Sequence, residues 1–267
     1  MIKFGVGQPV TRLEDTRLLK GKGRYQDDTN LPGQLHVVFL RSPHAHAKIR
    51  AIDTSAAVAA PGVQAVYTGA DYAADGLAMP KAAMPRKKAD GSPMFAPQRP
   101  ALVVDRARYI GDPIAMIIAE TLAQAKDAAE LVEIDYEPLP SVTSTADAAR
   151  PDAPRVWDEN PDNISHTYER GDKAKTEATF AHARHIVRHR YVISRVHAQY
   201  MEPRGAIGTY DPGEDRFTLY ADVNYPHRVR NMLANMVFKI PESKVRSSAT
   251  MSAAASAPRA GNMSSTA

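Results

Sequence analysis

Residues 101–140, ALVVDRARYIGDPIAMIIAETLAQAKDAAELVEIDYEPLP, decide the fold of this chain. The β-branched run at their start predicts a strand, Gly111-Asp112-Pro113 predicts a turn, and the apolar run after the turn predicts a second, buried strand. Thr121 is placed to cap an alanine-rich helix, which leads into a strand that stops at Pro138. Strands that alternate with short helices are typical of an α+β or α/β architecture.

The residues before this stretch continue the alternation. Residues 35–40 predict a buried strand, residues 53–55 predict the cap of a short helix, and residues 63–69 predict another strand. Residues 74–100 are rich in Pro, Met and Lys, which is typical of a long surface loop.

The residues after it form a second unit. Residues 141–165, rich in Pro, Asp, Ala and Ser, predict an interdomain linker. Residues 185–196 (HIVRHRYVISRV) and 215–223 (DRFTLYADV) predict strands, and residues 227–238 (HRVRNMLANMVF) predict an amphipathic helix. A further strand is expected to begin at Val245 and to break off at once, because no periodic apolar pattern follows Arg246. The apolar positions of the predicted helix are Val229, Met232, Leu233, Met236 and Val237.

Composition sets wide limits on the class of protein. The chain has 267 residues, 43% of them hydrophobic and 24% charged, which allows one large or two ordinary soluble domains. It has no Cys, so it can supply neither disulfides nor thiolate ligands for a metal or an iron–sulfur cluster. The net charge of +4 is scattered, which argues against a nucleic-acid partner. No apolar run is long enough to cross a membrane or to form a secretory signal, so we expect a cytoplasmic protein without a membrane partner.

Histidines and carboxylates give no catalytic pattern. His44 and His46 would share one face of a strand, but a metal site needs three or four ligands and no third one is evident. Three further histidines (His182, His185 and His189) would line one face of a helix, whereas the β-branched residues among them favour a strand, on which His182 faces away. The separated carboxylates Asp27, Asp28, Asp112 and Glu202 are expected in turns or caps. There is no G-x-S-x-G elbow and no phosphate-binding Walker loop.

Long motifs carry a family resemblance. The strings GQPVTRLEDTRLLKGKGRYQDD, LPGQLHVVFLRSPHAHAKI and YIGDPIAMIIAET resemble the N-terminal α/β hammerhead domain of the aldehyde oxidase and xanthine dehydrogenase family. The strings MEPRGAIGTYDP and DRFTLYADVNYPHRVRNMLANMVFKIPESKVR are similar to the molybdopterin-binding large subunits of its bacterial members, such as those of the aerobic carbon-monoxide-dehydrogenase type. The resemblance covers residues 7–246 and implies an α+β fold: a hammerhead domain followed by the truncated start of a molybdopterin-binding domain.

The resemblance also implies a chemistry. Such enzymes insert water-derived oxygen into an aldehyde or an N-heterocycle, or oxidise carbon monoxide, at molybdenum held by molybdopterin cytosine dinucleotide. Their electrons pass to iron–sulfur clusters on a small subunit and to FAD on a medium subunit, which would explain the absence of Cys here. The family segment S-T-Q-x-P-H places its Gln near a molybdenum oxo ligand; here the segment is DVNYPH, so Asn224 takes that position. Asn keeps the amide donor and acceptor on a shorter stem. An alternative role for Asn224 is to order the turn before Pro226.

The tail departs from the family pattern. After K-V-R the family continues into a strand and the motif G-G-G-F-G, whereas this chain continues SSATMSAAASAPRAGN. One synonymous DNA sequence for this tail, with a single G restored in front of it, encodes a peptide that contains G-G-G-F-G. The expected layout is therefore a hammerhead domain at 1–143, a linker at 144–165, the beginning of a molybdopterin-binding domain at 166–246 and an out-of-frame tail at 247–267.

Two functions follow from this layout. The first is part of a molybdenum hydroxylase large subunit that is inactive and binds no cofactor as this chain alone, because the glycine motif and the family's catalytic Glu lie beyond the truncation. The alternative is a non-catalytic, hammerhead-like module that docks onto partner subunits.

Overall fold

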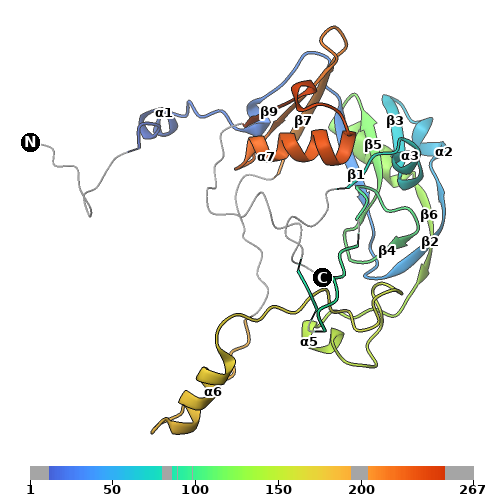
Figure 1. Ribbon diagram of the computed structural model, residues 1–267. Coiled ribbons are helices and arrows are strands. Elements are labelled where there is room, and N and C mark those ends of the chain that lie inside the picture. The colour runs from blue at the N-terminus through green and yellow to red at the C-terminus, as the bar shows by residue number, and fades with distance from the viewer. Residues whose placement is uncertain (1–11, 80–85, 89, 98, 194–203, 250–267) are drawn as a thin grey trace, which may run out of the picture. The chain divides into compact units, whose positions relative to one another are not determined.

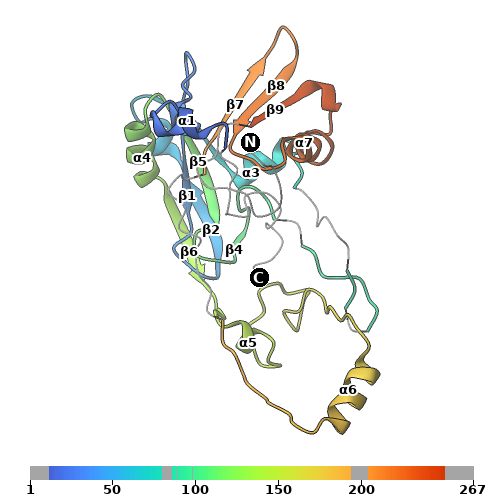
Figure 2. The ribbon, with the colours of Figure 1, turned by 90° about the vertical axis from the view of Figure 1, so that its left-hand side faces the viewer.

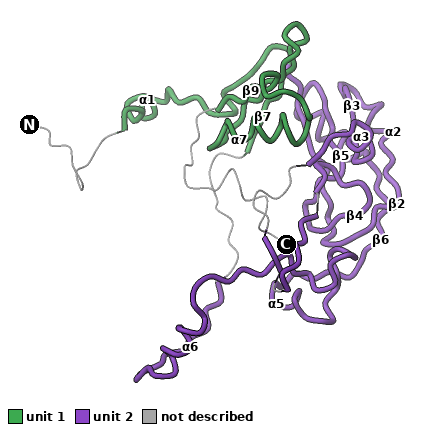
Figure 3. Tube along the Cα trace, in the orientation of Figure 1, with its two compact units in different colours: residues 1–33, 198–267 green, residues 34–197 purple. Residues whose placement is uncertain are grey.

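The computed structural model describes residues 12–79, 86–88, 90–97, 99–193 and 204–249. The chain forms two compact units, one of residues 34–197 and one that combines residues 1–33 with 198–267 (Figure 3). Within the described ranges, no helix is long and apolar enough to cross a membrane.

The unit of residues 34–197 contains two antiparallel three-stranded sheets. In the first, β5 (Pro113–Ala119) lies between β1 (His36–Arg41) and β3 (Val63–Thr68). In the second, β2 (Ala47–Asp53) lies between β4 (Arg106–Ala107) and β6 (Glu133–Pro138). The helices of this unit are α2 (Ser55–Val58), α3 (Gly69–Ala74), α4 (Leu122–Glu130), α5 (Thr145–Ala148) and α6 (Lys173–His182).

The core of this unit lies between α4 and the sheet β1-β5-β3 (Figure 2). Strand β5 contributes Ala115, Ile117 and Ala119, all fully buried. Helix α4 presents small side chains to the strands, which lets the two backbones approach closely. The α4 residues in this core are Ala125, Ala128 and Ala129. The alanine-rich pattern of the sequence therefore allows α4 to pack close to the sheet.

Local signals predicted this part well. Thr121 caps α4, because its side chain accepts a hydrogen bond from the Gln124 amide. The predicted strands at 35–40 and 63–69 are β1 and β3, and the buried strand after Gly111-Asp112-Pro113 is β5.

Two details differ from the prediction. β1 is half-buried on one face and exposed on the other, where Val37 and Phe39 are 44% and 42% exposed. The predicted strand at the start of the 101–140 stretch is reduced to β4. The apolar residues Leu102 and Val103 before β4 are buried as a loop. An apolar run indicates burial, and whether the buried segment is a strand depends on a partner strand.

The residues predicted as a linker, 144–165, make ordered contacts. They contain α5, and the Asn163 side chain makes three hydrogen bonds of 3.0 Å to backbone groups within the segment. Arg106 of β4 forms an ion pair of 3.0 Å with Asp158. The segment is thereby tied to the unit of residues 34–197.

The predicted strand at 185–196 is wrong over its described part. Residues 183–193 form no strand, and residues 194–196 lie outside the described residues. Val187, Val192 and Ile193 are more than 80% exposed. A β-branched sequence forms a strand only where a neighbouring strand takes up its backbone hydrogen bonds, and residues 183–193 pair with none among the described strands.

The second unit holds a three-stranded sheet in the order β7-β8-β9 (Figures 1 and 2). β7 (Ala206–Asp211) and β8 (Arg216–Ala221) form an antiparallel hairpin, whereas β9 (Val245–Ala249) runs parallel to β8. The crossover between β8 and β9 consists of α7 (Pro226–Asn231), a π-helical segment η2 (Met232–Phe238) and a short 3-10 helix η3 (Glu242–Lys244). Before β7, this unit also contains α1 (Asp15–Leu19) and the 3-10 helix η1 (Gln26–Asp28).

The predicted helix 227–238 is present, but its second half is wound as a π-helix. Phe238, at its end, stacks on Phe217 of β8 with ring centroids 5.0 Å apart. Ala234 is fully buried, while Met236, predicted on the apolar face, is 36% exposed. The other predicted apolar positions, Val229, Met232, Leu233 and Val237, are partly buried.

The expectation that the chain does not continue a strand after Arg246 is wrong. β9 extends to Ala249 and pairs with β8 along its whole length, with Ser248 opposite Tyr220. A parallel ladder is made by backbone groups, so Ser and Ala can occupy it although they add little side-chain packing. Residues 250–267 lie outside the described residues.

Candidate functional site

The carboxyl ends of β8 and β9 lie at the same end of the second unit's sheet. Because the two strands are parallel, the residues that follow β8 lie beside the point where β9 ends. Asn224 is in the short segment between β8 and α7, and it is exposed. Its side-chain amide has no recorded hydrogen bond to another described residue. The segment that follows β8 therefore presents an exposed amide donor and acceptor.

Helix α7 starts two residues after Asn224, at Pro226. Pro226 occupies its first turn, where a missing backbone N–H costs nothing. Tyr225, the residue at the N-cap, makes no capping hydrogen bond with its side chain. Asn224 lies in the bend before Pro226, and its side chain is exposed.

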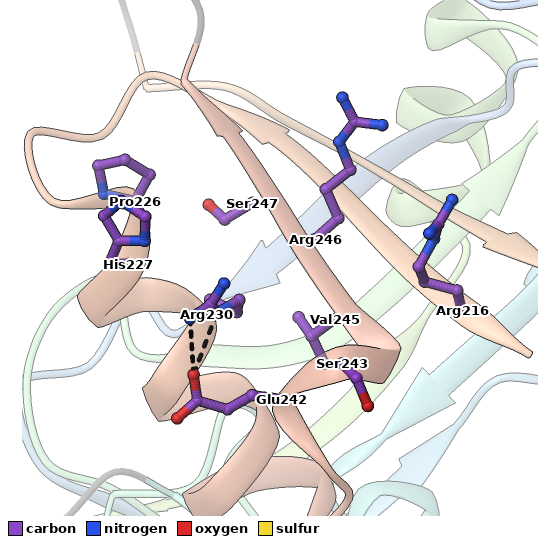
Figure 4. A pocket seen from close by; sticks show the side chains of 9 residues that line it. All are labelled: Arg216, Pro226, His227, Arg230, Glu242, Ser243, Val245, Arg246 and Ser247. Carbon is purple, nitrogen blue, oxygen red and sulfur yellow. Dashed lines mark hydrogen bonds and ion pairs between the residues drawn. The ribbon is translucent and has the colours of Figure 1, made fainter.

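A pocket of about 350 Å³ lies along α7 and the start of β9 (Figure 4). Its lining contains three arginines and a histidine but only one carboxylate. The lining residues are Arg216, Pro226, His227, Arg230, Glu242, Ser243, Val245, Arg246 and Ser247.

Glu242 is the single acidic residue of this lining, and it is fully engaged. Its carboxylate accepts hydrogen bonds from Asn231 at 2.8 Å and Asn235 at 3.1 Å. Arg230 adds an ion pair at 2.9 Å and a second contact through Nε at 3.1 Å. The hydrogen bonds from Asn231 and Asn235, together with Arg230, hold the pKa of Glu242 below its ordinary value. Glu242 therefore fastens α7 and η2 to the start of β9.

The sequence did not indicate this cluster. Arg230 and Glu242 are twelve residues apart and belong to no motif. They meet because the crossover returns the chain alongside α7, and no local spacing signals such a return.

The histidine pair His44 and His46 does not form a metal site. The two residues lie in the bend between β1 and β2 rather than on a strand. His46 is buried and its Nδ1 lies 2.8 Å from the carbonyl oxygen of Pro140, whereas His44 packs against the Tyr136 ring at 4.8 Å. The described residues contain no group of three or more His, Cys, Asp or Glu side chains that could hold a metal ion.

The other histidines are also apart. His182 is the last residue of α6, while His185 and His189 follow it in the non-helical segment. His189 contacts the ring of Tyr191, with centroids 4.5 Å apart. Neither the helical nor the strand arrangement considered from the sequence is realised for the three residues together.

Two of the separated carboxylates, Asp28 and Asp112, have the cap or turn roles that we expected. Asp28 accepts a hydrogen bond of 2.8 Å from the Tyr25 amide at the start of η1. Asp112 accepts one of 3.0 Å from the Arg108 amide, and its burial raises the pKa of the carboxyl group. Asp27 lies within η1 and is exposed, and Glu202 lies outside the described residues.

Comparisons with known proteins identify two domain families in this chain. Residues 20–140 match the family model described as "Aldehyde oxidase and xanthine dehydrogenase, a/b hammerhead domain". Residues 156–251 match the model described as "Molybdopterin cofactor-binding domain", which includes Asn224 and the pocket.

Relatives cover nearly the whole chain. It is 38% identical to the nicotine 6-hydroxylase large subunit of Paenarthrobacter nicotinovorans, over 86% of this chain and 27% of that protein. It is 36% identical to the carbon monoxide dehydrogenase large chain of Afipia carboxidovorans, over 90% of this chain and 30% of that protein. The crystal structure of quinoline 2-oxidoreductase from Pseudomonas putida 86 superimposes with a TM-score of 0.82 at 35% identity, covering 93% of this chain and 30% of that chain.

The chain thus spans less than a third of the length of these relatives. Within that span it has the hammerhead domain and the start of the cofactor domain in the family's order, and these family members are molybdenum-dependent oxidoreductases. On the strength of its two matched domains, its relatives and its fold, the chain belongs to the aldehyde oxidase and xanthine dehydrogenase family.

Proposed function

We propose that this chain is part of a molybdenum hydroxylase large subunit that inserts water-derived oxygen into an aldehyde, an N-heterocycle or carbon monoxide. The observation that carries the proposal is the position of Asn224. Asn224 is exposed in the segment that follows the carboxyl end of β8, which runs parallel to β9. This segment lies inside the match to a molybdopterin cofactor-binding domain. The substrate class follows from what the family members act on.

The cofactor proposed for the complete enzyme is molybdopterin cytosine dinucleotide. When bound, this group supplies the two-electron oxidation at molybdenum. The residue of this chain that fits it is Asn224, because its amide can both donate to an oxygen ligand and accept from a neighbouring N–H or water. Its role is to position: it would hold a polar ligand of the cofactor at the end of the sheet, directly or through one water.

Electron transfer partners are part of the proposal. An iron–sulfur small subunit and an FAD-containing medium subunit would take the electrons, since the chain has no Cys to hold a cluster. Three relatives support a multi-subunit arrangement: their names are "large subunit", "large chain" and "dehydrogenase complex subunit gamma". The proposed location is the cytoplasm.

The domain layout and the tail also remain proposals. We divide the chain into a hammerhead domain at 1–143, a connecting segment at 144–165 and the beginning of the cofactor domain at 166–246. Residues 247–267 are proposed to be read out of frame, although Ser247–Ala249 still pair as the end of β9. DNA sequencing across codons 240–267 tests the frame: the proposal requires a run that encodes G-G-G-F-G in the shifted frame, and its absence would refute it.

The chain of 267 residues alone is proposed to hold no molybdenum and to lack activity. A cofactor as large as a dinucleotide needs a concave site with many converging polar groups, and Asn224 supplies one of them. Metal analysis of the purified chain is the measurement. Stoichiometric molybdenum or hydroxylase activity would contradict this part of the proposal.

The decisive experiment uses the gene with its frame restored and the partner subunits co-expressed. Asn224→Ala should lower kcat while the molybdenum content stays unchanged, because the residue positions a ligand and does not form the binding wall. Asn30→Ala, at an exposed position of the same unit, is the matched control and should leave both quantities unchanged. An unaltered kcat in Asn224→Ala would assign the residue to the turn before Pro226 instead.

A further inference from the structure

A small cavity lies inside the unit of residues 34–197, beside the segment that leads into the match to the cofactor domain. Its volume is about 20 Å³. Its walls come from the bend between β1 and β2, from Arg108 after β4, from residues 140–142 and from residues 154–156. One water molecule needs roughly 10–15 Å³ of such space, so the cavity has the size of a single water site.

Two buried nitrogen atoms of the residues around this cavity have no hydrogen-bond partner among the described residues. They are Nε2 of His46 and Nε of Arg108. His46 is 8% exposed, so bulk water does not relieve the cost of leaving its nitrogen unpaired. Folded proteins pair almost all such groups, either with protein atoms or with ordered water. The two nitrogens therefore indicate a bound molecule of the size of a water.

A segment that covers this unit from outside cannot pair these nitrogens. Both atoms are shielded from the surface, and the walls of the cavity all belong to this chain. A further segment would have to displace these walls to reach them. Arg108 is also fixed from within the unit: its Nη1 donates to the Arg106 carbonyl at 3.2 Å, and its backbone amide donates to Asp112 at 3.0 Å. The cavity is therefore complete whatever lies around the unit.

The two nitrogens offer one acceptor and one donor. His46 Nδ1 lies 2.8 Å from the carbonyl oxygen of Pro140, which can only accept, so Nδ1 carries the proton. In the neutral ring, Nε2 is then an acceptor. The Nε–H of Arg108 can only donate. A water molecule satisfies both groups, because it accepts from Arg108 and donates to His46, whereas a halide ion has no proton to donate to Nε2.

Arg108 connects this cavity to Trp157. The guanidinium carbon of Arg108 lies 5.3 Å from the centroid of the Trp157 ring, and Trp157 is within the residues that match the cofactor domain. A cation–π contact requires the guanidinium to stay over the face of the ring. Since Nη1 is already bonded to the Arg106 carbonyl, a partner at Nε fixes the plane of the guanidinium. Occupation of the cavity therefore determines how firmly Arg108 holds Trp157.

We propose that the cavity binds one water molecule, which accepts a hydrogen bond from Arg108 Nε–H and donates one to His46 Nε2. The bound water is a positioning element. It orients the Arg108 guanidinium against Trp157, and it thereby fixes the segment that leads into the cofactor domain to the hammerhead unit. This role is independent of Asn224 and of the cofactor chemistry proposed above.

A crystal structure of the 267-residue chain tests the site directly. We expect one density peak at about 2.7–3.2 Å from both nitrogens. His46→Phe keeps an aromatic ring but removes the acceptor, so the peak should be lost. His46→Gln ends in an amide that can accept the same hydrogen bond, so it should retain the peak. His44→Phe is the matched control and should also retain it, because His44 lies in the same bend and does not line the cavity.

Near-ultraviolet circular dichroism measures the consequence in solution. Trp157 is the single tryptophan, so its bands report how firmly its ring is held. His46→Phe should weaken these bands, whereas His46→Gln and His44→Phe should leave them as in the unaltered chain. Far-ultraviolet circular dichroism of each variant verifies that the fold is retained.

Three outcomes would overturn the proposal. The first is the absence of a density peak between the two nitrogens in the unaltered chain. The second is an anomalous peak at this position in crystals grown with bromide, which would identify an anion site instead. The third is a His46→Phe variant that loses the peak but keeps the Trp157 bands, because the water would then not orient Arg108.

Discussion

Truncation of Ile117 to alanine measures how much a buried side chain of β5 contributes to the free energy of unfolding of the hammerhead unit. Ile117 is fully buried on the central strand of its sheet, among the alanines of α4 and β5. Ile118, the next residue, lies on the opposite face and is half-buried. The two residues have the same side chain, the same strand and neighbouring positions, so each is the natural control for the other.

The expected cost follows from burial. Ile117→Ala removes three carbon groups, which corresponds to about 2.4 kcal/mol at roughly 0.8 kcal/mol for each buried methylene. The cavity left behind adds to this, so that the total reaches about 3–5 kcal/mol. For a unit of this size, 1 kcal/mol lowers Tm by about 2–4 °C, so we expect a fall of roughly 6–20 °C. Ile118→Ala should cost about 1 kcal/mol, because that side chain already contacts solvent.

Urea unfolding provides the assay. Trp157 is the single tryptophan, and its ring packs against Phe95 at 5.9 Å in the same unit, so its fluorescence reports unfolding of that unit. Circular dichroism gives an independent record of the sheet. If Ile118→Ala destabilises the unit as much as Ile117→Ala, the assignment of the two faces of β5 is refuted.

Three further predictions concern other parts of the chain. Gly69→Ala should destabilise the hammerhead unit by about 1–3 kcal/mol or more in urea unfolding, because a Cβ there collides with the Val103 carbonyl; full stability would contradict this packing. Hydrogen bonds from two asparagines hold the pKa of Glu242 below its ordinary value, so the ionised carboxylate stabilises its unit above that ordinary value. This contribution should be lost as pH falls through the lowered pKa, and an acid-unfolding curve unchanged in Glu242→Gln would refute it. Trypsin should cut residues 173–193 before residues 144–165, since α6 has no buried residue; mass spectrometry of the early fragments decides the order.

The sequence by itself determined the elements whose signals are local. Thr121 caps α4 because the bond from its side chain to the Gln124 amide spans three residues. Gly111, at positive φ, and Pro113 mark the turn before β5 because their backbone restrictions do not depend on distant contacts. Long motifs likewise identified the family and placed Asn224 in the segment that matches the cofactor domain.

Tertiary structure alone decided which strand-like segments became strands. Residues 183–193 have a β-branched sequence but no strand partner among the described residues, whereas Ser247–Ala249 have a weak sequence and pair with β8. The same holds for the basic pocket, where Arg230 and Glu242 meet only after the crossover has returned the chain to the sheet. The physical reason is that a cap or a turn satisfies its hydrogen bonds within a few residues. A strand, an ion pair or a pocket needs a second segment, and the position of that segment depends on the packing of the rest of the chain.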